Sequence, residues 1–274
     1  MQDSRSVEQN NPVAGSLNRD PLAKAIKLIG WMADHGGGPF GVRQLAAALG
    51  TPPSTVHRTL RLLEQNQMVL RVGEGQYSLG LEMFRLSQQV LAVFDIKKLA
   101  RRHLVDLVEK CNESAFLGLY DKDRQQMVLV DSVSSTHPLR YIVDLNEWRP
   151  VHAGASGLGI LAFLPPAEIE EIFDRTGLYA VTERTLTDPE HMSEELELTR
   201  SRGYAITHGQ RISGSVGLAA PVRDATGTVI GDVCLTVPEQ RFRAEDEGTL
   251  SEALLSCAAA ISGELTHGAR RRAQ

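Results

Sequence analysis

The residues best suited to chemistry lie in one short stretch, TPPSTVHRTLRLLEQN, from Thr51 to Asn66. Val56, Leu60 and Leu63 fall at positions i, i+4 and i+7 of a helix, so this side must face a core. The opposite side carries short hydrogen-bond donors and arginines, namely Ser54, Thr55, His57, Arg58 and Arg61. A recognition helix presents such groups to base edges and phosphates of DNA. The alternative is an ordinary solvated face of a helical pair.

The segments around this stretch have the order of a winged helix-turn-helix. A shorter helix is predicted over Val42–Gly50, with Gly50 as its C-terminal cap. Thr51 is expected to cap the next helix, with Pro52 in its first position. A glycine-tipped hairpin follows over Met68–Gly80. Three further candidate DNA contacts come from this framework: Arg43, Thr51 and Arg71.

Two other helices flank the predicted DNA-binding unit. Apolar residues at helical spacing predict a first helix with one stripe packed inward: Leu22, Ile26, Ile29 (with Leu28) and Met32 or Ala33. From Leu81 to Phe94 the apolar residues are too numerous for one surface stripe. A helix that is apolar on two faces needs two partners, which we expect to be its own domain and a neighbouring subunit.

The length of the chain and the distribution of its charges both indicate two domains. A chain of 274 residues is long enough for two domains. Residues 1–80 carry 8 Lys/Arg against 6 Asp/Glu, whereas residues 81–274 carry 21 against 28. Any contact with phosphates is therefore expected in the first third. The expected parts are a disordered tail (1–20), a DNA-binding domain (21–80), a linker helix (81–95), a second domain (96–267) and a basic tail (268–274).

The rest of the composition argues against a membrane protein, a disulfide-stabilised protein and a metalloprotein. The sequence has no run of 18 apolar residues, so no spanning helix and no membrane partner are expected. The three cysteines (Cys111, Cys234 and Cys257) are odd in number and form no CxxC pair, which favours a reducing cytoplasm over a disulfide framework. The histidines and cysteines share no metal-ligand spacing, so neither a metal nor a cofactor is predicted.

Beyond Asn112 the pattern changes to short apolar strands mixed with helices. The fold class predicted from this mixture is α+β, with one antiparallel sheet and helices beside it. A last helix is expected over Glu245–Leu265. The predicted strands are 114–120, 126–133, 139–145, 215–224 and 229–238.

A small-residue turn, GASGLG, contains the one serine that invites a catalytic interpretation. Ser156 stands where a serine hydrolase has its nucleophile, but Leu158 replaces the last glycine of GxSxG. An enzyme is therefore not expected, and Ser156 is better explained as a residue at the start of a helix that caps it or donates to a ligand.

Several separated blocks, taken together, resemble the IclR family of bacterial transcriptional regulators. They are RQLAAALGTPPSTVHRTLRLLEQNQMV with YSLG, PVHAGASGLGILAFLP, and RGYAITHGQRISGSVGLAAPVRDATGTVIGDVCLTVPEQRF. The resemblance spans Leu22 to about Leu265. It implies a winged helix-turn-helix joined by a linker helix to a GAF-like effector-binding domain, which works as a homodimer or a dimer of dimers.

The resemblance also implies an effector pocket, carried over to Ala155, Ser156, Gly157, Thr207, His208, Gly217, Cys234 and Thr236. Backbone amides at a helix N-terminus favour a carboxylate there. Cys234 and Thr236 alternate onto one face of a strand and can both face one cavity. The chain departs from many relatives, with Leu158 in place of a lysine and the run from Thr207 to Gln210 in place of acidic residues. These departures suggest an aromatic or otherwise larger acid.

The resulting hypothesis is a regulator that binds a (pseudo)palindromic double-stranded operator as a homodimer. A small organic acid in the second domain modulates that binding. Two alternatives stay open at this point: a sensor domain controlled by a protein partner, and a redox sensor at Cys234.

Overall fold

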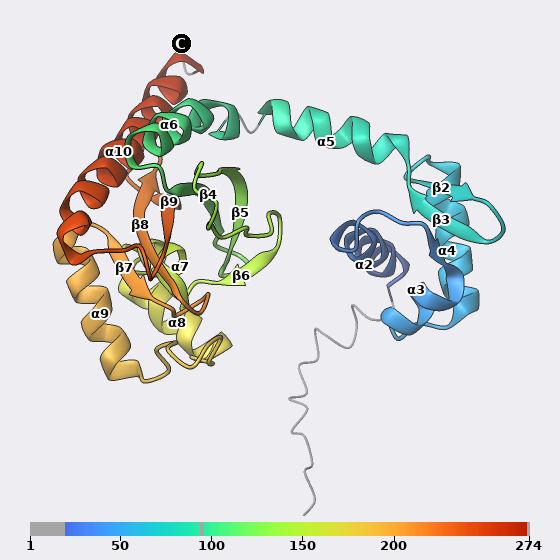
Figure 1. Ribbon diagram of the computed structural model, residues 1–274. Coiled ribbons are helices and arrows are strands. Elements are labelled where there is room, and N and C mark those ends of the chain that lie inside the picture. The colour runs from blue at the N-terminus through green and yellow to red at the C-terminus, as the bar shows by residue number, and fades with distance from the viewer. Residues whose placement is uncertain (1–19, 94–95, 273–274) are drawn as a thin grey trace, which may run out of the picture. The chain divides into compact units, whose positions relative to one another are not determined.

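A computed structural model describes residues 20–93 and 96–272, and the chain divides into two compact units between Phe94 and Asp95 (Figure 1). The polar tail expected over residues 1–20 lies outside the described residues except for Asp20. Within the described ranges no helix combines the length and apolar character needed to cross a membrane.

The first unit is a small helical domain with a three-stranded antiparallel sheet in the order β1-β3-β2. β1 was not expected from the sequence, because two residues are too few to show a strand pattern. The core gathers Leu45 of α3 and Leu60 of α4 with Tyr77 of β3. The elements are α2 (Pro21–Asp34), β1 (Phe40–Gly41), α3 (Val42–Ala48), α4 (Pro53–Gln65), β2 (Val69–Val72), β3 (Gln76–Leu79) and α5 (Leu81–Val93).

The inward stripe predicted for the first helix is confirmed at Leu28 and Met32 and wrong at Leu22 and Ile26. Leu28 and Met32 are the buried residues of α2, whereas Leu22 and Ile26 are largely exposed. The apolar surface of α2 is wider than its contact with the core, so only the side that carries Leu28 and Met32 is covered. Leu22 and Ile26 are left as an apolar surface patch.

The turn between α3 and α4 confirms one predicted cap and corrects the other. Gly50 has φ +58°, and the amides of Gly50 and Thr51 donate to the carbonyls of Ala47 and Ala46, which is a Schellman motif. Thr51 does not cap α4. Its hydroxyl donates back to the Leu49 carbonyl at 3.2 Å, and Pro52 occupies the N-cap position.

The second unit is built on a six-stranded sheet in the order β6-β5-β4-β9-β8-β7, and every neighbouring pair is antiparallel. The last helix continues to Arg272, beyond the predicted end at Leu265. The elements are α6 (Ile96–Cys111), β4 (Ser114–Asp121), β5 (Gln126–Val133), β6 (Trp148–Pro150), α7 (Gly154–Leu161), α8 (Pro166–Thr176), α9 (Pro189–Arg202), β7 (Ala205–His208), β8 (Ser215–Arg223), β9 (Val229–Pro238), η1 (Ala244–Asp246) and α10 (Glu247–Arg272).

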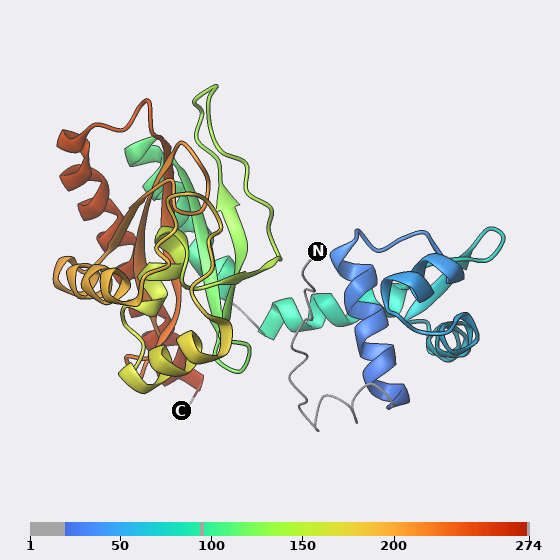
Figure 2. The same cartoon turned by 90° about the horizontal axis from the view of Figure 1, so that it is seen from below.

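The antiparallel sheet with helices beside it confirms the predicted α+β class, and the helices cover both faces of the sheet (Figure 2). α6 and α10 pack on one face against Leu117 and Leu235. α7, α8 and α9 pack on the other, where Phe116 and Cys234 belong to the core. Successive residues of β4 and β9 thus enter different cores, because side chains alternate across a strand.

The strand predicted over residues 139–145 is absent from the structure. This segment is a loop between β5 and β6, and the sheet gains only the short β6 after it. Leu139 and Ile142 are exposed, whereas Val143 and Leu145 pack against the core beside α7. The apolar run therefore serves partly as a surface loop and partly as a cover over that core, which is why its composition suggested a strand.

Candidate functional site

One candidate site is the exposed face of α4 in the first unit. Val56 and Leu60 are fully buried behind it, as the spacing predicted, and Leu63 is half-buried against the same core. Thr55 is half-buried, on the side of α4 that faces α2. The candidate side chains that are exposed on α4 are Ser54, His57, Arg58 and Arg61.

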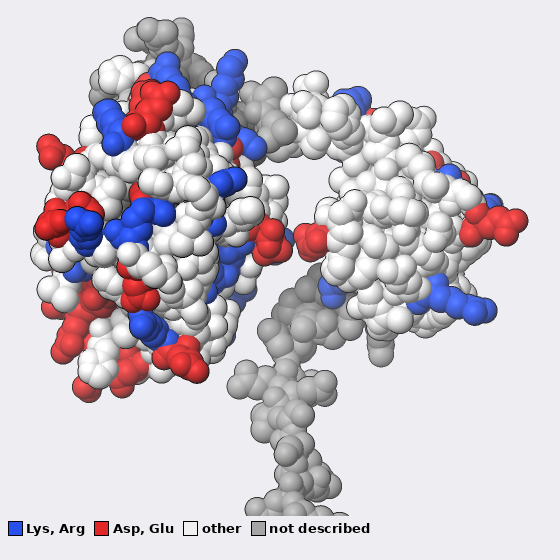
Figure 3. Space-filling model, in the orientation of Figure 1, with Lys and Arg blue, Asp and Glu red and all other residues white. Residues whose placement is uncertain are grey.

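Among the residues that the structure describes, four candidate arginines of the first unit lack the acidic partners that several arginines of the second unit have. Within the described residues, none of four candidate arginines makes a hydrogen bond or ion pair: Arg43 on α3, Arg58 and Arg61 on α4, and Arg71 on β2. In the second unit, by contrast, Arg101 pairs with Asp131 and Arg241 with Glu113. Figure 3 likewise shows acidic and basic side chains crowded together on the visible face of the second unit. Exposed guanidinium groups without acidic partners are available to phosphates.

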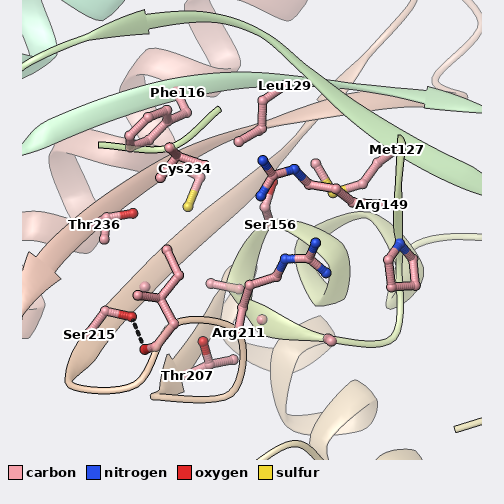
Figure 4. A pocket seen from close by; sticks show the side chains of 17 residues that line it. Phe116, Met127, Leu129, Arg149, Ser156, Thr207, Arg211, Ser215, Cys234 and Thr236 are labelled. Carbon is pink, nitrogen blue, oxygen red and sulfur yellow. Dashed lines mark hydrogen bonds between the residues drawn. The ribbon is translucent and has the colours of Figure 1, made fainter. Parts of the chain in front are cut away.

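A second candidate site is a cavity of about 570 Å³, including its opening to solvent, between the sheet and the start of α7 in the second unit. Its apolar wall comes from Phe116 on β4, Met127 and Leu129 on β5, and Val143 in the loop before β6. Ile212, in the turn between β7 and β8, also lines the cavity, and the side chains that surround it are drawn in Figure 4. An apolar lining with a small number of polar groups is typical of a small-molecule site.

Most of the residues predicted for an effector pocket line this cavity: Ala155, Ser156, Thr207, Gly217, Cys234 and Thr236. Two do not. Gly157 faces away, where an added Cβ would lie 2.5 Å from the Val151 carbonyl oxygen. His208 is exposed, and its ring stacks edge-on against Phe242. Thr207 and His208 are neighbours on β7, so only one of them can point into the cavity.

The hydroxyl of Ser156 is engaged by an acid that the sequence did not reveal. Ser156 Oγ donates to Asp232 Oδ2 at 2.6 Å, and Asp232 is completely buried on β9. Burial raises the pKa of Asp232 to about 8, and the hydrogen bond from Ser156 opposes part of that rise. Ser156 therefore does not cap α7, whose N-cap is Ala153.

Two arginines at the cavity were also missed. Arg149 on β6 and Arg211 in the β7–β8 turn both extend into it (Figure 4). Arg211 lies against Gly154, where an added Cβ would be 2.7 Å from Arg211 Cβ. Burial first, and then repulsion from Arg149, lower the pKa of Arg211. The two arginines come from opposite edges of the sheet, so their positions in the sequence did not indicate that both would line one cavity.

The chemistry of the cavity gives no support to catalysis by Ser156. The neighbouring His152 is buried, and its Nε2 lies 2.9 Å from the Tyr179 carbonyl oxygen. Burial lowers the pKa of this imidazole. Cys234 is also unsuited to form a thiolate, because burial and the charge of Asp232 raise its pKa well above the ordinary value. In the described part of the chain no three His, Cys, Asp or Glu residues gather as metal ligands.

Comparisons with known proteins match both units of the chain to one family. The family model described as "Bacterial transcriptional regulator IclR C-terminal" matches residues 88–263, and the "IclR helix-turn-helix domain" model matches residues 21–73. The chain is similar to the glycerol operon regulatory protein of Streptomyces griseus, with 31% identity over 255 residues that cover 92% of this chain and 98% of that protein.

Solved structures of two relatives share the fold. The Thermotoga maritima IclR superposes with a TM-score of 0.70 at 27% identity, covering 89% of this chain and 98% of the other. An IclR homolog from Microbacterium hydrocarbonoxydans, complexed with 4-hydroxybenzoate, superposes with a TM-score of 0.78 at 22% identity, covering 90% and 99%. The chain is a DNA-binding transcriptional regulator, not an enzyme, and it belongs to the IclR family.

Proposed function

We propose that this regulator reads operator DNA with α4 and that a small organic acid, bound in the cavity beside α7, modulates the binding. The observation that carries the proposal is the combination of apolar walls with two cavity-facing arginines, Arg149 and Arg211. A carboxylate binds at guanidinium groups and a hydrocarbon body packs against apolar side chains.

The DNA-binding surface that we propose comprises Arg43, Thr51, Ser54, Thr55, His57, Arg58, Arg61 and Arg71. The four arginines without acidic partners support it, because each can neutralise a phosphate. Ser54 and His57 are exposed on the same helix and can reach base edges. Thr51 and Thr55 contribute less, since Thr51 Oγ1 already donates to Leu49 and Thr55 is half-buried.

The effector that we propose is a carboxylic acid, with aromatic acids included. Phe116, Met127 and Leu129 provide a flat apolar wall against which a ring can pack. The relative from Microbacterium hydrocarbonoxydans, complexed with 4-hydroxybenzoate, supports this class of ligand for a protein of this fold. The first amides of α7 and the two arginines supply the positive potential that a carboxylate needs.

We further propose that the protein acts in the cytoplasm as a homodimer, or a dimer of dimers, on a (pseudo)palindromic operator. Leu22 and Ile26 on α2, with Leu81 and Phe84 on α5, are large apolar side chains exposed on the first unit. A second copy that covers such surfaces pairs two recognition helices, and a two-fold dimer matches two half-sites. The acid then shifts the population between spacings that fit and do not fit DNA, to the extent of its differential affinity for them.

Titration calorimetry with the full chain tests the effector proposal. The panel contains benzoate, 4-hydroxybenzoate, pyruvate and succinate, each repeated with the chain bound to operator DNA. We expect at least one acid to bind and its affinity to differ between free and DNA-bound protein. No heat from any acid, with DNA binding intact, would overturn the proposal and favour a sensor domain that binds a protein.

A further inference from the structure

The charged residues of the cavity are all of one sign. Among the described residues that line it, only Arg149 and Arg211 are charged, and no carboxylate faces them from the wall. The other polar lining groups are hydroxyls and one thiol, from Ser156, Thr207 and Cys234 among others. The cavity therefore holds two positive charges in a mostly apolar surround, which is costly unless an anion joins them.

Arg211 has no partner of its own. In the described part of the chain it makes no hydrogen bond or ion pair, and its Nη1 atom is buried. Burial and then the like charge of Arg149 lower the pKa of Arg211, whereas Tyr179 and Glu147 raise it. A guanidinium carries five N–H donors, and none of those of Arg211 meets an acceptor among these residues.

Arg149 is only partly satisfied. Its Nη2 donates to the Asp144 carbonyl at 2.6 Å, and the same atom lies 3.4 Å from Glu147 Oε2. Glu147 is 64% exposed, so solvent screens its charge, whereas the Arg149 side chain is 12% exposed. The Nε atom of Arg149 is buried without a partner. Both arginines thus keep donors for a ligand.

From this arrangement we infer that the effector is a dianion, with two carboxylates close together at one end and a hydrocarbon body at the other. A single carboxylate balances only one of the two positive charges. The other guanidinium group is then left without an anion in the cavity. Phe116 lies away from both arginines in Figure 4 and makes that part of the lining apolar, so a carboxylate placed there loses its hydration without a cationic partner. This inference rests on the proposed effector site.

Three acids with one ring test the inference by calorimetry on the full chain: benzoate, phthalate (1,2-dicarboxylate) and terephthalate (1,4-dicarboxylate). We expect phthalate to bind at least about tenfold more tightly than benzoate, a difference of about 1.4 kcal/mol. Terephthalate carries the same charge as phthalate but directs one carboxylate toward the apolar wall, so we expect it to bind more weakly than phthalate.

The outcomes separate the two proposals. Binding of benzoate as tight as that of phthalate overturns the dianion and leaves the proposed organic acid standing. Equal binding of phthalate and terephthalate also overturns it, because attraction by net charge alone then explains the data. If none of these acids binds, and the wider panel of acids also gives no heat, the proposed effector function itself fails.

Variants of Arg211 test whether its positive charge produces the preference for phthalate. Arg211→Gln is expected to reduce phthalate affinity at least about tenfold and benzoate affinity less, so that the preference for phthalate disappears. Arg211→Lys keeps the charge and should retain the preference. The matched control is Arg184→Gln, because Arg184 pairs with Glu239 and does not line the cavity. A preference for phthalate that survives in Arg211→Gln, with an unchanged melting temperature, contradicts the inference.

Discussion

Ser156 on α7 and Asp232 on β9 form a buried hydrogen bond with 2.6 Å between Oγ and Oδ2. Asp232 Oδ1 has no partner among the described residues, and it fills the space beside Gly118, where an added Cβ would lie 2.0 Å away. The serine that lines the cavity is therefore held from behind by Asp232, which does not itself line the cavity. Because burial raises the pKa of Asp232, we expect the stability of the second unit to depend on pH.

We predict that the wild type is destabilised at neutral and alkaline pH by Asp232 and that the Asp232→Asn variant does not show this loss of stability. The pKa of Asp232 is raised from 3.8 to about 8 in the folded protein, so the folded state keeps a proton that the unfolded state releases. The free energy of unfolding should therefore fall between about pH 4 and pH 8, by up to about 1.4 kcal/mol per pH unit. Asparagine has no charge to bury, and its amide can donate to Ser156.

Thermal melting of the wild type and the variant from pH 5 to pH 9 checks this prediction. The wild type should lose more melting temperature than Asp232→Asn as the pH rises. The control is Asp123→Asn, which replaces an exposed aspartate in the β4–β5 turn and should follow the wild type. Parallel curves for the wild type and Asp232→Asn would show that Asp232 ionises in the folded state as freely as in the unfolded state.

We predict that Arg58→Ala and Arg61→Ala each weaken operator binding in a salt-dependent manner. Both side chains are exposed on α4 without acidic partners in the described residues. If each contacts one phosphate, the slope of log K against log salt should fall by about 0.9 per recognition helix, or about 1.8 for a dimer. Arg243→Ala, an exposed arginine of the second unit that pairs with Glu245, is the control. Unchanged DNA affinity in both variants would refute the proposed role of this face.

The sequence predicted local features more reliably than the cavity. Helical spacing identified the buried side of α4 through Val56 and Leu60, and strand alternation placed Cys234 and Thr236 on one face of β9. Both patterns depend only on neighbours in the chain, so they can be detected without knowing the fold.

The residues that could not be predicted from the sequence depend on contacts between distant parts of the chain. Arg149 and Arg211 meet only because β6 and β7 are the two edges of one sheet whose loops turn toward the same side. Asp232 is an isolated acid within an apolar strand, and its partner Ser156 is 76 positions away in the sequence. The exposed positions of Leu22 and Ile26 could not be foreseen either, because an apolar stripe does not reveal how much of it the core covers.

We predict that Gly154→Ala weakens acid binding more than its loss of stability alone explains. Gly154 has φ +80°, and an added Cβ would lie 2.7 Å from Arg211 Cβ. The backbone strain should cost about 1–3 kcal/mol, and the contact should displace Arg211 from the cavity. Gly227→Ala is the matched control, since Gly227 has φ +86° and no atom within 4 Å of an added Cβ. Both variants should melt earlier, but only Gly154→Ala should bind acids more weakly in calorimetry below its melting temperature.

We predict that Phe84→Asp weakens self-association without unfolding the first unit. Phe84 is 63% exposed and Leu81 is 76% exposed on α5, so neither holds the monomer together, and a substitution at Phe84 should change its stability by no more than about 0.5 kcal/mol. A charge buried between two copies is far more costly, because it has no partner there. The dissociation constant of the dimer, measured by sedimentation equilibrium, should therefore rise.

A control variant with a charge elsewhere on α5 distinguishes the loss of the dimer contact from a general effect of added charge. Gln89→Asp changes another exposed position of α5, away from the side that carries Leu81 and Phe84, and should leave the dimer intact. Operator DNA with two half-sites should bind Phe84→Asp more weakly than the wild type, whereas DNA with a single half-site should bind both alike, because only the full operator needs two linked helices. If Phe84→Asp dimerises as tightly as Gln89→Asp, the second copy covers some other surface than this side of α5.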